Sequence, residues 1–257
     1  MHIVVTGASS GIGAALAREL GKERGARLTL VARRRELLER LAKEIDAPVH
    51  LVVRDLAAAD ENDDWIEEAE AVHGPIDVLV NNAGVQVIAP TARVDIGAGE
   101  ASLRLNLATP LRLIARMLPG MLRRKRGQIV NVSSMAALAP TPGMTYYNAS
   151  KAGLAAASEA LRGELRGTGV NVITVYPGII AGTEMATSAL TKYESSKLLR
   201  MQPTGTAREL ARAVRVSMAR RRARLVFPRV YGFTRWFPTL VRIVMDWFSP
   251  RLIEPAK

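Results

Sequence analysis

The sequence predicts a single α/β domain built on a doubly wound parallel sheet of about seven strands, with helices on both faces. Short apolar runs alternate with amphipathic helical stretches along most of the chain. A glycine-rich turn separates the first run from the first helical stretch, and no internal repeat or linker interrupts the pattern. With 257 residues, 48% of them hydrophobic, the chain can bury one large core.

Each predicted strand is a short apolar run, and each predicted helix carries apolar residues at helical spacing. The strands are predicted at residues 3–5, 27–32, 49–53, 76–80, 128–132, 170–175 and 224–227. The helices are predicted at residues 14–20, 36–45, from 60 onward, 100–118, from about 147 to 165, and 207–219. Strands that alternate with helices in this way favour a parallel sheet, because parallel neighbours need crossover connections.

The first strand leads directly into the turn Thr6-Gly7-Ala8-Ser9-Ser10-Gly11-Ile12-Gly13. Gly7 permits a sharp turn, Gly11 allows the backbone to approach a pyrophosphate, and Gly13 allows close packing of helix and strand. The helix N-terminus then offers free N–H groups to phosphate. A turn without a ligand is the alternative, but the strand–turn–helix context predicts a Rossmann-type dinucleotide site.

The end of the second strand bears on the choice of dinucleotide. Enzymes that prefer NAD place an acidic residue here for the ribose 2′-hydroxyl, whereas this chain has Ala32 followed by Arg33 and Arg34. Guanidinium groups match a 2′-phosphate in charge and geometry. Arginines also commonly open exposed helices, which suits Arg35, but the missing acid favours NADP.

Polar motifs follow three further strands. Asn81-Asn82-Ala83-Gly84 follows the fourth strand, Ser133-Ser134 the fifth, and Pro177-Gly178 the sixth. Because the carboxyl ends of parallel strands border the ligand crevice, these motifs are expected to meet there. Tyr147 and Lys151 lie four residues apart on a predicted helix and therefore share a face.

Taken together, these motifs and their order resemble the short-chain dehydrogenase/reductase superfamily, in its short single-domain branch, over roughly residues 1–227. The resemblance rests on the TGxxxGIG turn, the NNAG motif, Pro177-Gly178 and the catalytic tetrad, which corresponds to Asn106, Ser134, Tyr147 and Lys151. The YxxxK spacing selects Tyr147 rather than Tyr146, and the usual distance to that tyrosine selects Ser134 rather than Ser133. The threonine after Pro-Gly is Thr183, one residue later than the family usually places it.

The resemblance implies a role for each member of the tetrad. Tyr147 would be the acid/base, and its ordinary pKa of about 10 would be lowered by Lys151⁺ and the nicotinamide cation. Lys151 would also hold the nicotinamide ribose, and Ser134 would stabilise developing charge on the substrate oxygen. Asn106 would hold a water that links Lys151 to solvent.

By the same resemblance, Asp55 would contact the adenine and Asn82 the adenosine ribose. The full set implied for binding NADP is Gly7, Ser9, Ser10, Gly11, Ile12, Gly13, Arg33, Arg34, Asp55, Leu56, Asn82, Ala83, Gly84, Tyr147, Lys151, Pro177, Gly178, Ile180 and Thr183.

The implied activity is NADP(H)-dependent interconversion of a ketone or aldehyde and an alcohol. The residues expected at the substrate are Ser134, Met135, Met144 and Tyr147, with Gln86 and Ile180 also lining the pocket. Their mostly apolar character favours a hydrophobic carbonyl over a sugar. Residues 183–203 suit a lid over the pocket, although a plain surface loop is the alternative.

A non-catalytic NADP(H)-binding regulatory or interaction protein is the alternative function. Such relatives usually lack the tyrosine or the lysine of the tetrad, whereas both are present here. The resemblance also implies a homodimer or homotetramer formed through the helices around Asn106 and after Tyr147.

The formal charge of +12 suggests nucleic acid, an anionic membrane or a solvated basic surface. The basic runs at 123–126 and 220–222 lack interleaved aromatic residues, so a solvated surface is preferred and no nucleic acid is expected. The chain has no cysteine, and His2, His50 and His73 lack metal-ligand spacing, so no metal is expected. No signal-peptide pattern opens the sequence, which predicts a cytoplasmic protein.

Residues 228–257 form a distinct tail, since seven of the twelve aromatic residues lie between Phe227 and Phe248. Helices are predicted at 230–237 and 239–248, separated by Pro238. Arginines and Asp246 interrupt the apolar residues, which argues against a membrane span. Either the tail folds back over the pocket or a partner subunit, which is the preferred interpretation, or it lies in a membrane interface.

Overall fold

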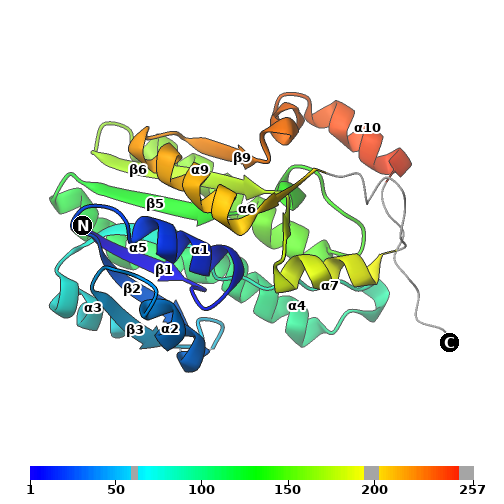
Figure 1. Ribbon diagram of the computed structural model, residues 1–257. Coiled ribbons are helices and arrows are strands. Elements are labelled where there is room, and N and C mark those ends of the chain that lie inside the picture. The colour runs from blue at the N-terminus through cyan, green and yellow to red at the C-terminus, as the bar shows by residue number, and fades with distance from the viewer. Residues whose placement is uncertain (59–62, 194–202, 249–257) are drawn as a thin grey trace.

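A seven-stranded parallel sheet forms the centre of the computed structural model, which describes residues 1–58, 63–193 and 203–248 (Figure 1). The strand order is β3-β2-β1-β4-β5-β6-β9, and every neighbouring pair is parallel. The strands are β1 (His2–Thr6), β2 (Arg27–Ala32), β3 (Val49–Val53), β4 (Ile76–Asn81), β5 (Gly127–Val132), β6 (Val170–Pro177) and β9 (Arg224–Phe227). The predicted doubly wound α/β fold is confirmed.

Helices cover both faces of the sheet. One face packs against α1 (Gly11–Leu20), α2 (Arg35–Ala42) and α9 (Ala207–Ala219). The other face packs against α3 (Trp65–His73), α5 (Thr109–Arg123) and α6 (Thr145–Glu164). The other helices of the described residues are α4 (Ile96–Leu103), α7 (Glu184–Lys192), α10 (Pro238–Phe248) and the short turns η1 (Thr91–Arg93), η2 (Arg104–Ala108), η3 (Met135–Ala137) and η4 (Arg229–Arg235).

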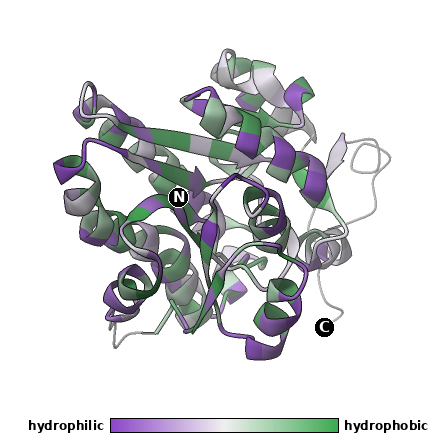
Figure 2. Ribbon diagram, turned by 60° about the vertical axis from the view of Figure 1, so that its left-hand side comes forward, coloured by the Kyte–Doolittle hydropathy of each residue, from purple (hydrophilic) through white to green (hydrophobic). Residues whose placement is uncertain are grey.

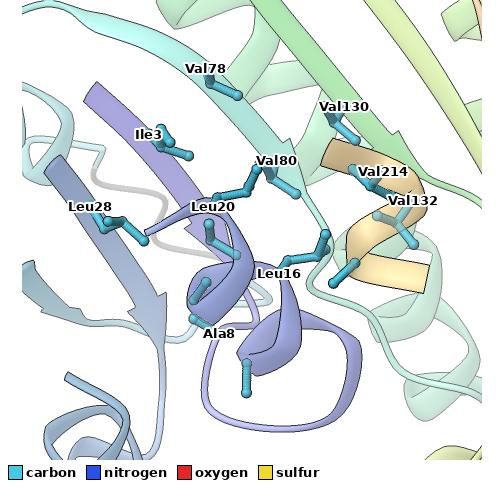
Figure 3. Packing of buried hydrophobic residues seen from close by; sticks show 14 of the residues in the cluster. Ile3, Ala8, Leu16, Leu20, Leu28, Val78, Val80, Val130, Val132 and Val214 are labelled. Carbon is cyan, nitrogen blue, oxygen red and sulfur yellow. The ribbon is translucent and has the colours of Figure 1, made fainter. Parts of the chain in front are cut away.

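Alternate residues of each strand enter the cores on the two sides of the sheet. Ile3 and Val5 of β1 join the core beneath α1, whereas Val4 between them joins the core beneath α3 and α5. Figure 3 shows Leu16 of α1 and Val214 of α9 packing on the side chains of the central strands. Because both faces are buried, the strands read as continuous apolar runs, and Figure 2 shows them as a hydrophobic centre surrounded by more hydrophilic helices.

The strand order reverses at β1, which lies between β2 and β4. At such a switch point the loops after adjacent strands diverge to opposite faces and leave a crevice at the carboxyl edge of the sheet. The glycine turn follows β1 and the Asn82-Ala83-Gly84 segment follows β4. The fold therefore places these two motifs together at the crevice.

The helix predicted at 100–118 is longer and less regular than expected. It runs as α4, then the π-helical turn η2, then α5. Pro110 explains the wide turn, because a proline ring clashes with the carbonyl four residues earlier in a regular helix, which here belongs to Asn106.

The segment expected to be a lid is also more ordered than a plain loop. Two short strands border it, β7 (Ile179–Ala181) and β8 (Thr204–Thr206), and they pair with each other. Its described part contains α7, which Thr183 caps by accepting a hydrogen bond from the Ala186 N–H. Neither short strand was predicted, because each has only three residues and the pairing is long-range. Residues 194–202 of the expected lid lie outside the described residues.

The tail forms η4 and α10. The predicted break at Pro238 is instead the first residue of α10, a position where proline is favoured because its missing N–H is not needed. Residues 249–257 of the tail lie outside the described residues, as do residues 59–62 of the acidic stretch. Within the described chain, none of the helices has the length and hydropathy needed to cross a membrane.

All three histidines gather at the amino-terminal edge of the sheet. The rings of His2 and His73 lie 5.3 Å apart, and those of His50 and His73 lie 6.3 Å apart. His2 bonds the Gly74 carbonyl and the Thr29 hydroxyl through its two ring nitrogens. Burial lowers the pKa of His2 and of His73, with the neighbouring imidazoles adding to the effect.

This cluster predicts that the protein loses stability in mild acid. The unfolded state takes up protons on His2 and His73 near their ordinary pKa of 6.5, before the folded state does. Stability is therefore full above that pH and falls as the pH decreases below it. Urea unfolding between about pH 7.5 and pH 5 checks this. His73→Gln should flatten the dependence, and an equally steep slope in that variant would contradict the assignment.

Candidate active site

The glycine turn after β1 is built for close backbone packing. Gly7 has a φ of +65°, and a Cβ there would lie 2.7 Å from the Ala83 Cα. A Cβ on Gly13 would lie 2.1 Å from the Gly7 carbonyl oxygen. Gly11, with a φ of +53°, instead has room, since its Cβ would meet only Thr183, at 3.5 Å. The α1 N-terminus that follows has no acidic residue in its first turn, which leaves its dipole available to an anion.

The segment after β4 clamps this turn. The Thr6 hydroxyl accepts hydrogen bonds from the Asn82 and Ala83 N–H groups, at 3.0 and 3.1 Å, and donates one to the Val80 carbonyl. The Asn82 side-chain amide donates to the Thr6 carbonyl at 2.9 Å and to the Gly7 carbonyl at 3.3 Å. The Asn82 amide therefore helps to fix the shape of the glycine turn.

Arg34 lies directly over the turn. Its guanidinium donates to the Ser10 hydroxyl at 2.6 Å, to the Ser9 hydroxyl at 3.3 Å and to the Glu184 carboxylate at 3.2 Å. Arg33 points elsewhere and donates to the Asp55 carboxylate at 3.5 Å. Of the two arginines, Arg34 is thus the one brought to the turn. Glu184 was missed from the sequence, because only the fold brings α7 back to this place.

Asn106 sits in the π-helical turn and is fully buried. Its side-chain oxygen Oδ1 accepts a hydrogen bond from the Val85 N–H at 2.9 Å, and its side-chain nitrogen Nδ2 donates one to the Val85 carbonyl at 2.8 Å. The amide also reaches the Ser150 hydroxyl at 3.1 Å. A Cβ on Gly84 would lie 2.9 Å from the Asn106 Oδ1 and 3.4 Å from the Lys151 Nζ. Gly84 is therefore needed for Asn106 and Lys151 to approach the NNAG segment.

Lys151 is buried on α6 with its ammonium donating to the Val132 carbonyl at 2.9 Å. Its Nζ lies 5.9 Å from the centre of the Tyr147 ring. Burial lowers the pKa of Lys151 to about 8. Its charge is therefore easily lost in mild alkali, which makes it unlike a surface lysine.

Tyr147 faces the same space from one turn earlier on α6. Burial raises the pKa of its hydroxyl, and a hydrogen bond with the Ser134 hydroxyl opposes that rise. Ser134 also accepts from the Ala136 N–H at 3.1 Å, which fixes its position after β5. The structure thus brings Asn106, Ser134, Tyr147 and Lys151 to one place at the carboxyl edge of the sheet.

The neighbouring residues that compete for these roles are turned away. Ser133 is buried and donates its hydroxyl proton to the Lys151 carbonyl at 2.8 Å, so it braces the helix. Tyr146 packs its ring on Gly99 of α4, where a Cβ would lie 2.7 Å from the ring carbons.

An apolar cluster adjoins the Tyr147 hydroxyl. Met144, Tyr147 and Tyr193 are buried together, with Ile88 and Ala136 packed against them. Tyr193 donates to the Pro142 carbonyl at 2.8 Å, and the Gln86 amide donates to the Met144 sulfur at 3.3 Å. The Tyr147 hydroxyl lies 3.8 Å from the sulfur of Met185 on α7. Met185 and Tyr193 were missed, because neither belongs to a sequence motif.

The other predicted site residues lie around the same edge. Gly178 donates its N–H to the Phe227 carbonyl at 2.7 Å, and Pro177 ends β6 beside it. Ile180 is buried in the core beneath α1, with Ile12 packed against that core. The Thr183 hydroxyl caps α7 and donates to the Ile180 carbonyl, so it is already committed within the protein. Leu56 is buried, and Met135 opens the turn η3 after Ser134.

The crevice of this Rossmann-type sheet is bordered by a buried tyrosine and lysine, which places the chain among nucleotide-binding α/β proteins. The family model for short chain dehydrogenases matches residues 1–194. The chain therefore belongs to the short-chain dehydrogenase/reductase family.

Individual relatives agree with this assignment. The chain is 36% identical to a fatty acyl-CoA reductase of Mycobacterium tuberculosis, over 89% of this chain and 76% of that protein. It is 32% identical to the ketoacyl reductase HetN of Nostoc sp., over 83% and 75%. Among solved structures, a metagenomic short-chain oxidoreductase in complex with NADP matches with a TM-score of 0.72 and 32% identity, covering 88% of this chain and 96% of the other.

Across the described residues, no group of histidine and acidic side chains is arranged to hold a metal ion.

Proposed function

We propose that this protein is an NADP(H)-dependent oxidoreductase that interconverts a hydrophobic ketone or aldehyde and the corresponding alcohol in the cytoplasm. The observation that carries the proposal is the convergence of Tyr147, Ser134 and Lys151 beside the glycine turn. The bound nicotinamide would supply or accept the hydride. The protein's own residues would then have to bind the dinucleotide, hold the carbonyl and move one proton.

Several features of the crevice fit a dinucleotide. Gly11 leaves open space at the α1 N-terminus, and Arg34 already holds the serine hydroxyls of the turn. Gly7, Gly13, Asn82 and Ala83 would maintain the shape of this cradle. Arg34, together with Arg33, would favour the 2′-phosphate of NADP over a free hydroxyl. The NADP complex of the related metagenomic enzyme supports the choice of a nicotinamide dinucleotide.

In reduction, Tyr147 would donate its proton to the oxygen of the carbonyl as the alcohol forms, and in oxidation it would accept that proton. Ser134 would hydrogen-bond the same oxygen and stabilise its developing negative charge. Lys151⁺ would stabilise the resulting phenolate and hold the cofactor ribose. Asn106 would anchor Val85 and, through water, connect Lys151 to solvent.

The apolar cluster of Met144, Tyr193 and Ile88, closed by Met185, supports a hydrophobic substrate. Two of the relatives are named for the reduction of fatty acyl-CoA and ketoacyl compounds, which is consistent with a lipid-like carbonyl. Oxidation of NADPH against a panel of acyl, steroid, aryl and sugar carbonyls tests the proposal. Turnover of hydrophobic carbonyls would support it, whereas preference for a sugar would contradict it.

We also infer a homodimer or homotetramer formed through α4, α5 and α6, the helices around Asn106 and Tyr147. Leu111 and Leu122 on α5 and Ile96 on α4 are exposed apolar side chains that such a contact would bury. Size-exclusion chromatography with light scattering measures the number of subunits directly.

The lowered pKa of Lys151 predicts that NADPH binding weakens in mild alkali. The ammonium is charged below its pKa of about 8 and neutral above it, so the group that holds the ribose loses its charge as the pH rises. The Kd for NADPH should therefore rise above about pH 8 by up to about tenfold per pH unit. Fluorescence titration across this range measures it. Tyr147→Phe should keep the same dependence, and a Kd that is constant through about pH 9 would contradict the assignment.

A further inference from the structure

We propose that the tail segment formed by η4 and α10 docks this protein on an anionic lipid surface, beside the opening of the active site. The docking itself stands on the geometry and charge of the tail. Its consequence, direct entry of a hydrophobic carbonyl from the lipid, rests on the proposed function.

The tail exposes an unusual concentration of large apolar side chains. Half of the exposed large hydrophobic residues in the described chain lie between residues 230 and 247. Trp236 is 75% exposed and Trp247 is 80% exposed. The others are Val230, Phe233, Phe237, Leu240 and Ile243. Exposed patches of this kind mark interaction surfaces, whereas single exposed apolar residues do not.

The segment is anchored to the domain by its opposite side. Val241 and Thr234 are buried. The Tyr231 hydroxyl donates to the Pro203 carbonyl at 3.0 Å. The Tyr231 ring packs on Gly178, where an added Cβ would lie 3.0 Å from a ring carbon. The tail is thus held against the segment that follows β6, and its apolar side chains face outward from a fixed base.

α10 is amphipathic in the manner of an interfacial helix. Leu240, Ile243 and Trp247 recur at a spacing of three and four residues, which places them on one face. Thr239, Arg242 and Asp246 are also exposed and lie on a different face. With 11 residues, the helix is about 16 Å long and too short to span a bilayer. It is suited to lying in the plane of the interface, where tryptophan and arginine are favoured.

Charge favours lipid over a second copy of the chain as the occupant of this face. The chain carries a formal charge of +12, and residues 228–257 hold four arginines and Lys257 against only Asp246 and Glu254. A contact between two copies would bring two net-positive chains, and two net-positive tail sequences, against each other. An anionic lipid surface instead attracts both the tail and the rest of the protein.

The position of the tail links docking to the site. Gly178, which Tyr231 contacts, follows β6 directly, and the crevice lies at the carboxyl ends of these strands. Figure 1 shows α7 and α10 both beyond that end of the sheet. Met185 of α7 lies against the Tyr147 hydroxyl. A lipid surface that binds α10 would therefore lie on the same side of the molecule as the substrate entrance.

Flotation of the full chain with vesicles tests the proposal. We expect the protein to float with vesicles of phosphatidylcholine and phosphatidylserine at low salt, less at high salt, and not with phosphatidylcholine alone. The double variant Trp236→Ser, Trp247→Ser removes two large side chains that would be buried in the lipid surface. It should lower the partitioning of the protein onto vesicles at least about tenfold. The matched control, Val72→Ser with Val216→Ser, removes exposed apolar side chains outside the tail and outside the inferred subunit contact, and it should float like wild type.

Two measurements keep the outcomes distinct. Circular dichroism and NADPH oxidation without vesicles should be unchanged in the tryptophan variant, which shows that it folds and tests the proposed function separately. Absence of flotation by the wild-type chain, or equal flotation by both variants, would overturn the proposal. A third result would assign this face to a second copy of the chain. In that case the wild-type protein does not float, and light scattering shows that the tryptophan variant has a smaller oligomer than wild type.

Discussion

Tyr147→Phe is expected to lower kcat for carbonyl reduction by about 10²–10⁴-fold while NADPH still binds. Phenylalanine keeps the ring that packs with Met144 and Tyr193 and removes only the hydroxyl. That hydroxyl is the group that would give its proton to the substrate oxygen. Single-turnover oxidation of NADPH measures the loss, and fluorescence titration of NADPH confirms that the cofactor site is intact.

The matched control is Tyr146→Phe. The Tyr146 ring packs on Gly99 of α4, so its hydroxyl has no place in the proposed proton transfer. This variant should keep kcat within a few-fold of wild type. If Tyr146→Phe were the inactive enzyme and Tyr147→Phe the active one, the placement of the site would be one residue in error, and the role of Ser134 would fall with it.

The sequence predicted the doubly wound fold, and the structure brings its motifs to one edge of the sheet, because these motifs follow local rules. A glycine turn between a strand and a helix, and polar residues at strand ends, are brought together by any doubly wound sheet. The same logic placed Asn106 on a helix, but the π turn around it was not predicted. The turn is explained by the conflict between the Pro110 ring and the backbone of a regular helix. The match of Asn106 to the catalytic tetrad carries no information about that conflict.

The side of the site formed by α7 and Tyr193 could not be predicted in the same way. Met185, Glu184 and Tyr193 reach the site because β7 and β8 pair across a long stretch of sequence. No periodic pattern specifies a pairing of three residues on each side. The tail gives a similar lesson, since apolar spacing predicted its helices but could not say that Val241 faces the domain while Trp247 faces outward.

The arginines after β2 carry the second large expected effect. The sequence alone singles out Arg33 and Arg34 equally. In the structure Arg34 holds the serine hydroxyls of the glycine turn, whereas Arg33 pairs with Asp55. Both are retained as candidate phosphate ligands, with the larger effect assigned to Arg34.

Arg34→Ala is expected to raise the Kd for NADPH by roughly 10- to 150-fold, which corresponds to the loss of about 1.5–3 kcal/mol from hydrogen bonds to a charged group. NADH lacks the 2′-phosphate, so its Kd should change by only a few-fold. Arg33→Ala should give the same pattern at a smaller magnitude. Glu184→Gln provides the opposite control, because it removes the carboxylate that now pairs with Arg34 and should tighten NADPH binding. Equal efficiency of the wild-type enzyme with NADPH and NADH, or equal losses for both dinucleotides in Arg34→Ala, would show that the guanidinium serves the fold of the turn and does not read the 2′-phosphate.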